Sequence, residues 1–216
     1  KLNQQNLIAP VDYNIVDEIE KHAKDKIALA ICDDHGNVQK ITYGELVEQA
    51  IKVANTFLAQ GLQKGDVAIV MVPRSFEAYV TYIGALKAGL TIIPSSEMLR
   101  AKDLDYRIAH ADAKAVIAFS QYIDEINEAT QTENLQLYVA DKMEAVSNWQ
   151  PLFALAQDAD TTFSGERTVS DDVAFLAYTS GTTGNPKAAI HSHGWGYAHL
   201  RTTAEKWLGV QDGDIV

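Results

Sequence analysis

Cysteine is almost absent from this sequence: Cys32 stands alone among 216 residues, which excludes a framework of intrachain disulfide bonds. A chain of this length buries enough apolar surface to fold without covalent or metal staples. Cys32 ends the apolar run of residues 27–32, so we interpret it as a buried strand residue and not as a nucleophile. This cysteine usage is typical of the reducing cytosol, and we expect a cytoplasmic protein.

Basic residues and long apolar runs are also scarce. Lys and Arg number 18 against 29 Asp and Glu, which gives a formal net charge of −11, and the basic residues are scattered along the chain. Nucleic-acid binding depends on clustered Lys and Arg that release counterions, so no nucleic-acid partner is expected. The apolar runs fall well short of the roughly 20 residues that a membrane-spanning helix needs. The first residues also lack the apolar segment of a signal peptide, and we expect no membrane span.

Strand and helix patterns alternate along the chain. Residues 66–72 and 115–119 are short apolar runs rich in β-branched side chains, as in buried strands. Apolar residues spaced by three and four predict amphipathic helices within residues 46–58 and 76–90. This alternation predicts an α/β fold in which a mostly parallel sheet is flanked by helices on both faces.

The ends of these helices carry recognisable signals. Thr42 is followed three residues later by Glu45, which is the pattern of a capping box. Ser75 is placed to cap the second helix. Gly61 and Gly89 stand where the two apolar periodicities stop, as helix-terminating glycines do.

A loop rich in glycine and hydroxyl groups follows the apolar run of residues 173–178, which we interpret as a strand. Its glycines allow the backbone to fold tightly around an anion, its hydroxyl groups can donate to anion oxygens, and its lysine adds a positive charge. Hydrogen bonds to a charged group contribute roughly 1.5–3 kcal/mol each, so a few of them would supply much of the binding of a triphosphate. The candidate phosphate-binding residues are Thr179, Ser180, Gly181, Thr182, Thr183, Gly184, Asn185, Pro186 and Lys187.

The spacing of this loop differs from that of the Walker phosphate loop. Asn185 and Pro186 separate Gly184 from Lys187, whereas the Walker loop places a glycine directly before its lysine. Residues 188–193 have the pattern of a second short strand, so we expect a hairpin whose loop faces no helix N-terminus. Binding would then depend on the amides, hydroxyls and lysine of the loop itself. A surface hairpin that binds no ligand is the alternative for a stretch of this composition.

Residues 178–187, Tyr-Thr-Ser-Gly-Thr-Thr-Gly-Asn-Pro-Lys, resemble the signature of the adenylate-forming superfamily, which includes acyl-CoA synthetases, luciferases and the adenylation domains of peptide synthetases. Residues 41–46 resemble the family's early Thr-Tyr-x-Glu-Leu motif, and residues 86–90 with Pro94 resemble its Leu-Lys-Ala-Gly segment. The three motifs also occur in the family's order and spacing. We interpret the two earlier motifs as scaffold, because a capping box and a helix-ending glycine account for their residues.

Within the superfamily, residues 94–99 and 103–107 look most like the medium-chain and related short-chain acyl-CoA synthetases. Such relatives often carry Gly, Thr and Gln where residues 95–97 are Ser, Ser and Glu, so a coenzyme A contact at that Gln is not carried over. We interpret Tyr106 and Arg107 as part of an amphipathic helix face with a surface salt bridge.

The resemblance implies a two-step ligase. A carboxylic (fatty) acid would attack the α-phosphorus of ATP with Mg²⁺, giving an acyl-adenylate and pyrophosphate, and coenzyme A would then displace AMP to give acyl-CoA. Residues 1–216 would be the N-terminal part of the large domain, and the family's adenine, ribose and hinge motifs and its adenylation lysine are not found among them. Residues 212–216 look like a turn that leads into a strand, so we expect a truncated chain that is inactive by itself. Neither the acyl chain length nor the oligomeric state follows from the sequence.

The resemblance also implies roles for the loop. Its four hydroxyl residues would donate to the β- and γ-phosphates, its glycines would permit close approach, and Lys187 would offset charge or pin the loop. No catalytic residue and no metal ligand is assigned in this chain. His191 and His193 would share one face of the second strand, where we interpret them as core or cleft histidines. Two alternatives are kept: a non-catalytic nucleotide-binding module, and an adenylating enzyme that loads a carrier protein or activates an aromatic or amino acid.

Overall fold

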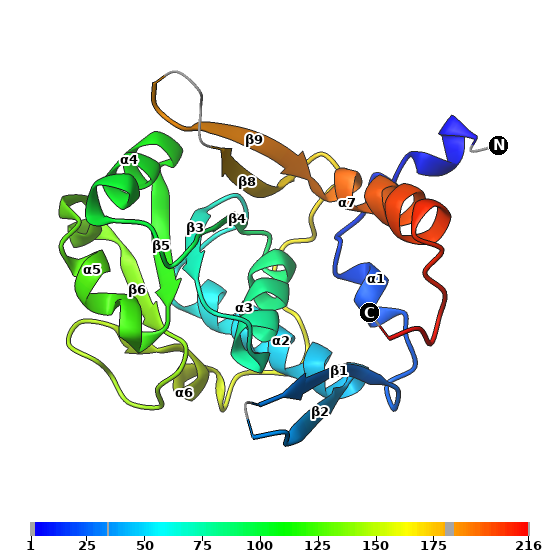
Figure 1. Cartoon of the computed structure of the whole chain (residues 1–216), viewed down its shortest axis with the longest axis horizontal. Helices are drawn as coiled ribbons and strands as arrows, with labels where there is room; N and C mark the ends of the chain where they lie inside the picture. The colour runs from blue at the N-terminus through cyan, green and yellow to red at the C-terminus, as the bar shows by residue number, and fades with distance from the viewer. Residues whose placement is uncertain (1–2, 34, 180–183, 216) are drawn as a thin grey trace.

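A sheet dominates the structure, a computed structural model that describes residues 3–33, 35–179 and 184–215. Its strands within these residues are β3 (Val67–Met71), β4 (Thr91–Pro94), β5 (Ala113–Ala118), β6 (Gln136–Val139), β7 (Gln150–Pro151), β8 (Val173–Thr179) and β9 (Lys187–Ser192). Their order across the sheet is β7-β6-β5-β3-β4-β8-β9 (Figure 1). Neighbouring strands from β7 to β8 are parallel, and β9 is antiparallel to β8. The predicted mostly parallel sheet is therefore confirmed.

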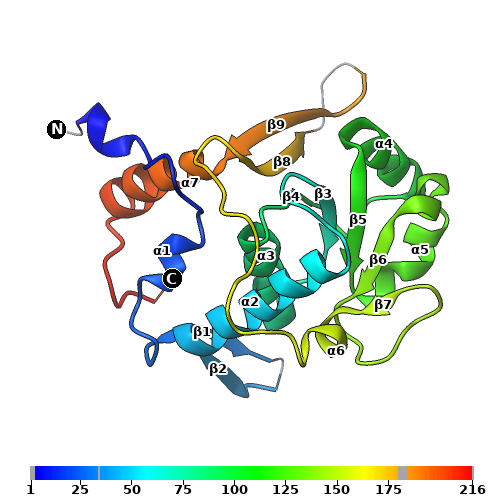
Figure 2. The same cartoon turned by 180° about the vertical axis from the view of Figure 1, so that it is seen from behind.

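Helices cover both faces of this sheet. The helices are α1 (Asp17–Glu20), α2 (Tyr43–Ala59), α3 (Phe76–Lys87), α4 (Ala101–Ala111), α5 (Ile123–Asn127), α6 (Leu152–Ala156) and α7 (His193–His199), with 3-10 turns at Gln4–Leu7, Ser120–Tyr122 and Thr130–Asn134 and a further helical segment at Leu200–Trp207. Successive strand residues point to opposite faces, so Val70 packs into a core with α2, α3 and α6, while Ile69 and Met71 pack into a core with α4 and α5. Figure 2 shows α2 and α3 from behind. The described residues contain no helix long and apolar enough to cross a membrane.

The sequence signals at the helix ends have the expected structures. Thr42 Oγ1 accepts a hydrogen bond from the Glu45 N–H at 3.2 Å, and a Glu45 carboxylate oxygen accepts one from the Thr42 N–H at 2.9 Å, which completes the capping box of α2. Ser75 caps α3 by accepting from the N–H of its third residue at 3.1 Å. Gly61 and Gly89 have φ angles of +97° and +79°, a region that glycine enters without a steric cost.

A separate two-stranded antiparallel sheet, β1 (Ile27–Cys32) and β2 (Val38–Thr42), lies beside the main sheet. Cys32 is a strand residue, as predicted, but it is exposed, so the prediction that it is buried is wrong. The cause is the position of β1. The small sheet contacts α2 and leaves its other face in solvent, whereas the strands of the main sheet are covered on both faces.

The N-terminal segment, residues 3–26 before β1, and the last described residues lie on one side of the molecule, to the right in Figure 1. Lys26 Nζ lies 2.7 Å from a carboxylate oxygen of Asp212, so the two segments also contact each other directly. The turn expected in residues 212–216 is present at Asp212 and Gly213, and described residues 214–215 that follow it are not in a strand.

Candidate functional site

The candidate phosphate loop joins β8 to β9, and the two strands form the antiparallel hairpin that the sequence predicts. The register runs from Val173↔Ser192 at the base to Thr179↔Lys187 at the tip. Four candidate residues, Ser180, Gly181, Thr182 and Thr183, lie outside the described residues. The structure therefore places the two ends of the loop. Because β9 begins at Lys187, the loop leads into a strand, as expected, and not into a helix N-terminus.

The described loop residues are exposed to solvent, except for Pro186, which is half-buried. Thr179 is exposed, and its hydroxyl donates to the Lys187 carbonyl oxygen at 3.5 Å. Gly184 has a φ of +100°, a conformation that side chains disfavour. Lys187 is exposed and makes no ion pair with the residues that the structure describes. Its ammonium group therefore lies in solvent with no carboxylate partner among the described residues, and an anion can reach it.

The hairpin is joined to the sheet through β4, at its base. Ile92 of β4 pairs with Phe175 of β8, and the Thr91 hydroxyl donates to the Val173 carbonyl oxygen at 2.9 Å. Beyond these contacts the tip extends past β4 toward α4 (Figures 1 and 2). The hairpin is thus attached to the sheet near its base and projects from it. The position of its tip, Thr179 and Lys187, therefore depends on contacts made at the base and at the tip.

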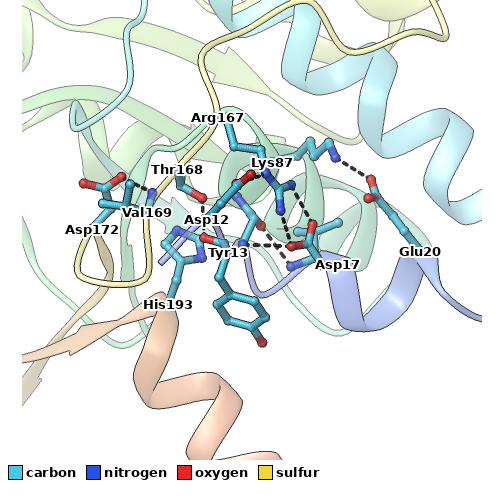
Figure 3. Close-up of polar contacts among 12 residues, drawn as sticks. Asp12, Tyr13, Asp17, Glu20, Lys87, Arg167, Thr168, Val169, Asp172 and His193 are labelled. Carbon is cyan, nitrogen blue, oxygen red and sulfur yellow. Dashed lines mark hydrogen bonds and ion pairs between the residues drawn. The ribbon is translucent and has the colours of Figure 1, made fainter. Parts of the chain in front are cut away.

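A buried histidine holds the base (Figure 3). His193 is 0% exposed, its Nδ1 accepts a hydrogen bond from the Ile15 N–H at 3.0 Å, and its backbone N–H donates to the Asp172 carbonyl at 3.0 Å. Burial lowers the pKa of His193 to about 4, so the ring is neutral at neutral pH. Since Nδ1 accepts, Nε2 carries the proton, and Nε2 has no hydrogen-bond partner among the described residues. His193 thus links the N-terminal segment to the hairpin.

The predicted strand over residues 188–193 is one residue too long. Ser192 caps α7 by accepting from the Trp195 N–H at 3.1 Å, so His193 begins a helix. The prediction that His191 and His193 share one strand face is therefore wrong, although His193 is a core histidine as predicted. His191 instead contacts Trp195, with ring centroids 4.4 Å apart, and Trp195 stacks on His199 at 4.8 Å.

Charged groups hold the N-terminal segment against the chain that leads into β8 (Figure 3). Arg167 pairs with Asp12 and Asp17. Burial would raise the pKa of Asp17, yet hydrogen bonds from Arg167 and from the Asn14 N–H keep it below its ordinary value. Next to this group the Thr168 hydroxyl donates to the Tyr13 carbonyl oxygen at 2.8 Å. The base of the hairpin is therefore packed against a fixed segment.

Helix α4 contacts both ends of the loop, which the sequence analysis missed. The Tyr106 hydroxyl donates to the Pro186 carbonyl oxygen at 3.0 Å, and His110 Nδ1 lies 2.7 Å from the Tyr178 hydroxyl oxygen. Arg107 lies over the Tyr178 ring, with 5.2 Å from its guanidinium carbon to the ring centroid. Tyr106 and Arg107 lie on an amphipathic helix, as interpreted. The expected surface salt bridge is wrong, because Arg107 donates to the Asp103 carbonyl oxygen at 3.0 Å and lies over the Tyr178 ring. The four-residue spacing of Tyr106 and His110 is visible in the sequence, but their distant partners are not.

Comparisons with known proteins agree with this geometry. The family model described as AMP-binding enzyme matches residues 16–216. The chain belongs to this family. It is 43% identical over 217 residues to the uncharacterized acyl-CoA ligase YtcI of Bacillus subtilis (strain 168), an alignment that covers 100% of this chain and 40% of that protein. It is 32% identical over 179 residues to the human mitochondrial acyl-coenzyme A synthetase ACSM2B, covering 81% of this chain and 30% of that protein.

Solved structures share the fold. A Brucella canis acyl-CoA synthetase superposes with a TM-score of 0.86 at 19% identity, over 100% of this chain and 41% of that one. ATP-bound MatB from Rhodopseudomonas palustris superposes with a TM-score of 0.66 at 32% identity, over 83% of this chain and 35% of that one. The family resemblance of the sequence is thus confirmed, and the chain spans between 30% and 41% of the length of these four relatives.

Proposed function

We propose that this chain supplies the ATP-phosphate loop of an enzyme that activates a carboxylic acid as an acyl-adenylate and passes the acyl group to coenzyme A. The observation that carries this proposal is the β8–β9 hairpin of a member of the AMP-binding enzyme family, with the signature at its tip and an exposed Lys187 beside it. The relatives named above as acyl-CoA ligases and synthetases support an acid-thiol ligase.

In this proposal the loop stabilises the leaving group. When the carboxylate attacks the α-phosphorus, negative charge gathers on the departing pyrophosphate, and hydrogen-bond donors and cations lower the energy of that state. The attacking carboxylate is already ionised, so the step needs no general base. The residues assigned to phosphate binding are Thr179, Ser180, Gly181, Thr182, Thr183, Gly184, Asn185, Pro186 and Lys187.

Magnesium and coenzyme A belong to the proposal as partners of the reaction. Among the described residues, no group of three or more His, Cys, Asp and Glu side chains could hold a metal ion. In this proposal magnesium accompanies the ATP phosphates, and coenzyme A is the acyl acceptor. We also propose a cytoplasmic location, which the sparing use of cysteine supports.

The test is ATP–pyrophosphate exchange by the complete native protein with linear, branched and aromatic carboxylates, followed by coenzyme A as acceptor. Exchange with fatty acids is expected. Lys187→Ala should lower kcat/KM for ATP about ten- to a hundredfold, because a hydrogen bond to a charged group is lost. Lys40→Ala, which removes an exposed lysine on β2, is the matched control and should change nothing. Unchanged ATP kinetics in the Lys187→Ala protein would reject the phosphate role.

A further inference from the structure

The carbonyl group of Pro186 is held by a residue 80 positions away in the sequence. The hairpin ladder ends at Thr179↔Lys187, so Pro186 is the first residue on the β9 side that the ladder does not pair. The Tyr106 hydroxyl donates to its carbonyl oxygen at 3.0 Å, and Pro186 is partly buried there. A proline also has a fixed φ angle, so this hydrogen bond leaves little freedom at the second end of the loop.

The first end of the loop is held by the next turn of the same helix. His110 Nδ1 lies 2.7 Å from the hydroxyl oxygen of Tyr178, the residue before Thr179. The rings of Tyr106 and His110 stack with centroids 5.3 Å apart, and the Tyr178 ring meets them edge-on at 6.3 and 5.7 Å. Such edge-on contacts are favourable for aromatic rings. One face of α4 thus contacts both ends of the loop.

Helix α4 is a fixed platform for these contacts. Its inner face is buried, with Leu104 0% and Ile108 4% exposed. At its start, a carboxylate oxygen of Glu125 accepts from the Ala101 N–H at 2.9 Å. On the side toward the 3-10 turn Thr130–Asn134, a carboxylate oxygen of Asp105 accepts from the N–H of the second residue of that turn at 2.8 Å. These contacts fix α4 to the rest of the domain independently of its contacts with the hairpin.

We propose that Tyr106 and His110 are positioning residues that hold the two ends of the phosphate loop in place for ATP. This rests on the proposed function of the loop. Tyr178 precedes Thr179 and Pro186 precedes Lys187, so the two contacts fix the backbone beside Thr179 and Lys187 before ATP binds. Groups that are already in place lose less freedom on binding, and ATP should therefore bind more tightly. Neither side chain needs to touch the nucleotide. The effect should therefore appear in the use of ATP and not in the use of the carboxylate.

The experiment measures KM for ATP and for the carboxylate separately, by ATP–pyrophosphate exchange in the complete native protein. Tyr106→Phe keeps the ring and removes only the hydroxyl. It should raise KM for ATP about two- to tenfold, which is the usual range for one lost hydrogen bond, and leave KM for the carboxylate unchanged. Tyr79→Phe is the matched control, because the Tyr79 hydroxyl on α3 makes no hydrogen bond to the described residues and its side chain is 38% exposed.

A second series tests His110. His110→Ala should raise KM for ATP over the same range, and His110→Asn should restore most of it, because an amide group can occupy the place of Nδ1 and bond the Tyr178 hydroxyl. Tyr178→Phe should have little further effect in the His110→Ala background, since the contact is already lost. A purely structural role of His110 would give no rescue by asparagine.

The outcomes separate this inference from the proposed function. If Lys187→Ala impairs ATP use but Tyr106→Phe and His110→Ala leave KM for ATP unchanged, the positioning role is wrong and the loop assignment stands. If the variants raise KM for ATP and for the carboxylate equally, they distort the whole site, and the positioning role is also wrong. If Lys187→Ala itself has no effect, the phosphate role fails and the positioning role fails with it.

Discussion

His193 shows how much one side chain can decide at the scale of single residues. Its Nδ1 accepts from the Ile15 N–H, 178 positions away, and its ring is completely buried. A buried imidazole is stable only in its neutral form, because burial penalises the charge. His193 therefore also makes the free energy of unfolding depend on pH.

The first residue-scale prediction concerns this pH dependence. The pKa of His193 in the folded protein, about 4, lies below its ordinary value of 6.5. The unfolded state therefore takes up the proton first, and stability falls as the pH drops from 6.5 to 4. The loss should reach about 3 kcal/mol. Urea unfolding at several pH values measures it.

The control is His193→Asn, whose amide oxygen can still accept from the Ile15 N–H but which does not titrate. Hydrogen bonds keep the pKa of Asp17 below its ordinary value in spite of burial, and Asp17 contributes acid sensitivity at lower pH in both proteins. The difference between the two curves therefore isolates the imidazole. Parallel curves between pH 6.5 and 4 would show that protonation of His193 does not limit stability.

At the scale of elements, an ion pair joins α1 to α3. Lys87 Nζ lies 2.6 Å from a carboxylate oxygen of Glu20, and Lys87 is only 9% exposed. Removing one partner of such a pair lowers stability, because the other charge stays buried without a partner. Replacing both partners by apolar side chains changes stability much less. The Glu20 side chain is 27% exposed, so water screens part of this effect.

The matching prediction is that removing Glu20 alone destabilises the protein more than removing both charges of the pair. Glu20→Ala should lower the free energy of unfolding by about 2 kcal/mol, because it leaves the Lys87 charge without its partner. Adding Lys87→Met should recover part of this loss, since the buried charge is then gone. Asp212→Ala, which breaks the exposed pair with Lys26, serves as the control and should change stability little. A double variant less stable than Glu20→Ala alone would contradict this account.

At the scale of the whole molecule, the β8–β9 hairpin lies at one edge of the main sheet and projects from it. The parallel strands are covered on both faces by α2, α3 and α6 and by α4 and α5, whereas the β8–β9 hairpin reaches past β4 toward α4 (Figure 1). The arrangement leaves Thr179 and Lys187 exposed to solvent and places α4 against Tyr178 and Pro186.

The whole-molecule prediction follows from the share of its relatives that this chain spans. The chain spans 40% of YtcI, and the family motifs for adenine, ribose and the adenylation lysine are not found among its 216 residues. A pure preparation of the 216-residue chain should therefore release no pyrophosphate from ATP when carboxylate is added. A coupled pyrophosphate assay measures this, with the complete native protein as positive control. Carboxylate-dependent release that disappears in Lys187→Ala would contradict the prediction.

Much of this fold could be predicted because its signals are local. Thr42 and Glu45 form the expected capping box, and Ser75, Gly61 and Gly89 mark helix ends as predicted. These features depend on backbone groups within a few residues, so composition and spacing reveal them. The hairpin was also predictable, because two apolar runs flank a segment whose glycine and proline residues disfavour strand structure.

The errors concern features set by distant neighbours. Cys32 has the pattern of a buried strand, but its strand joins a small sheet with an open face. His193 follows a strand pattern, but the Ser192 hydroxyl caps a helix at that point. Tyr106 resembles a solvated helix residue, but the hairpin tip passes close enough to accept its hydrogen bond.

The sequence by itself determined the family, the α/β alternation and the β8–β9 hairpin, because these depend on residue types at short spacing. The tertiary structure alone decided which groups contact the residues at the two ends of the candidate phosphate loop. Tyr106 and His110 meet Pro186 and Tyr178 because the parallel sheet brings α4 beside the hairpin tip. A hydrogen bond requires its donor and acceptor to lie about 3 Å apart, and only the folded sheet brings residues 80 positions apart to that distance.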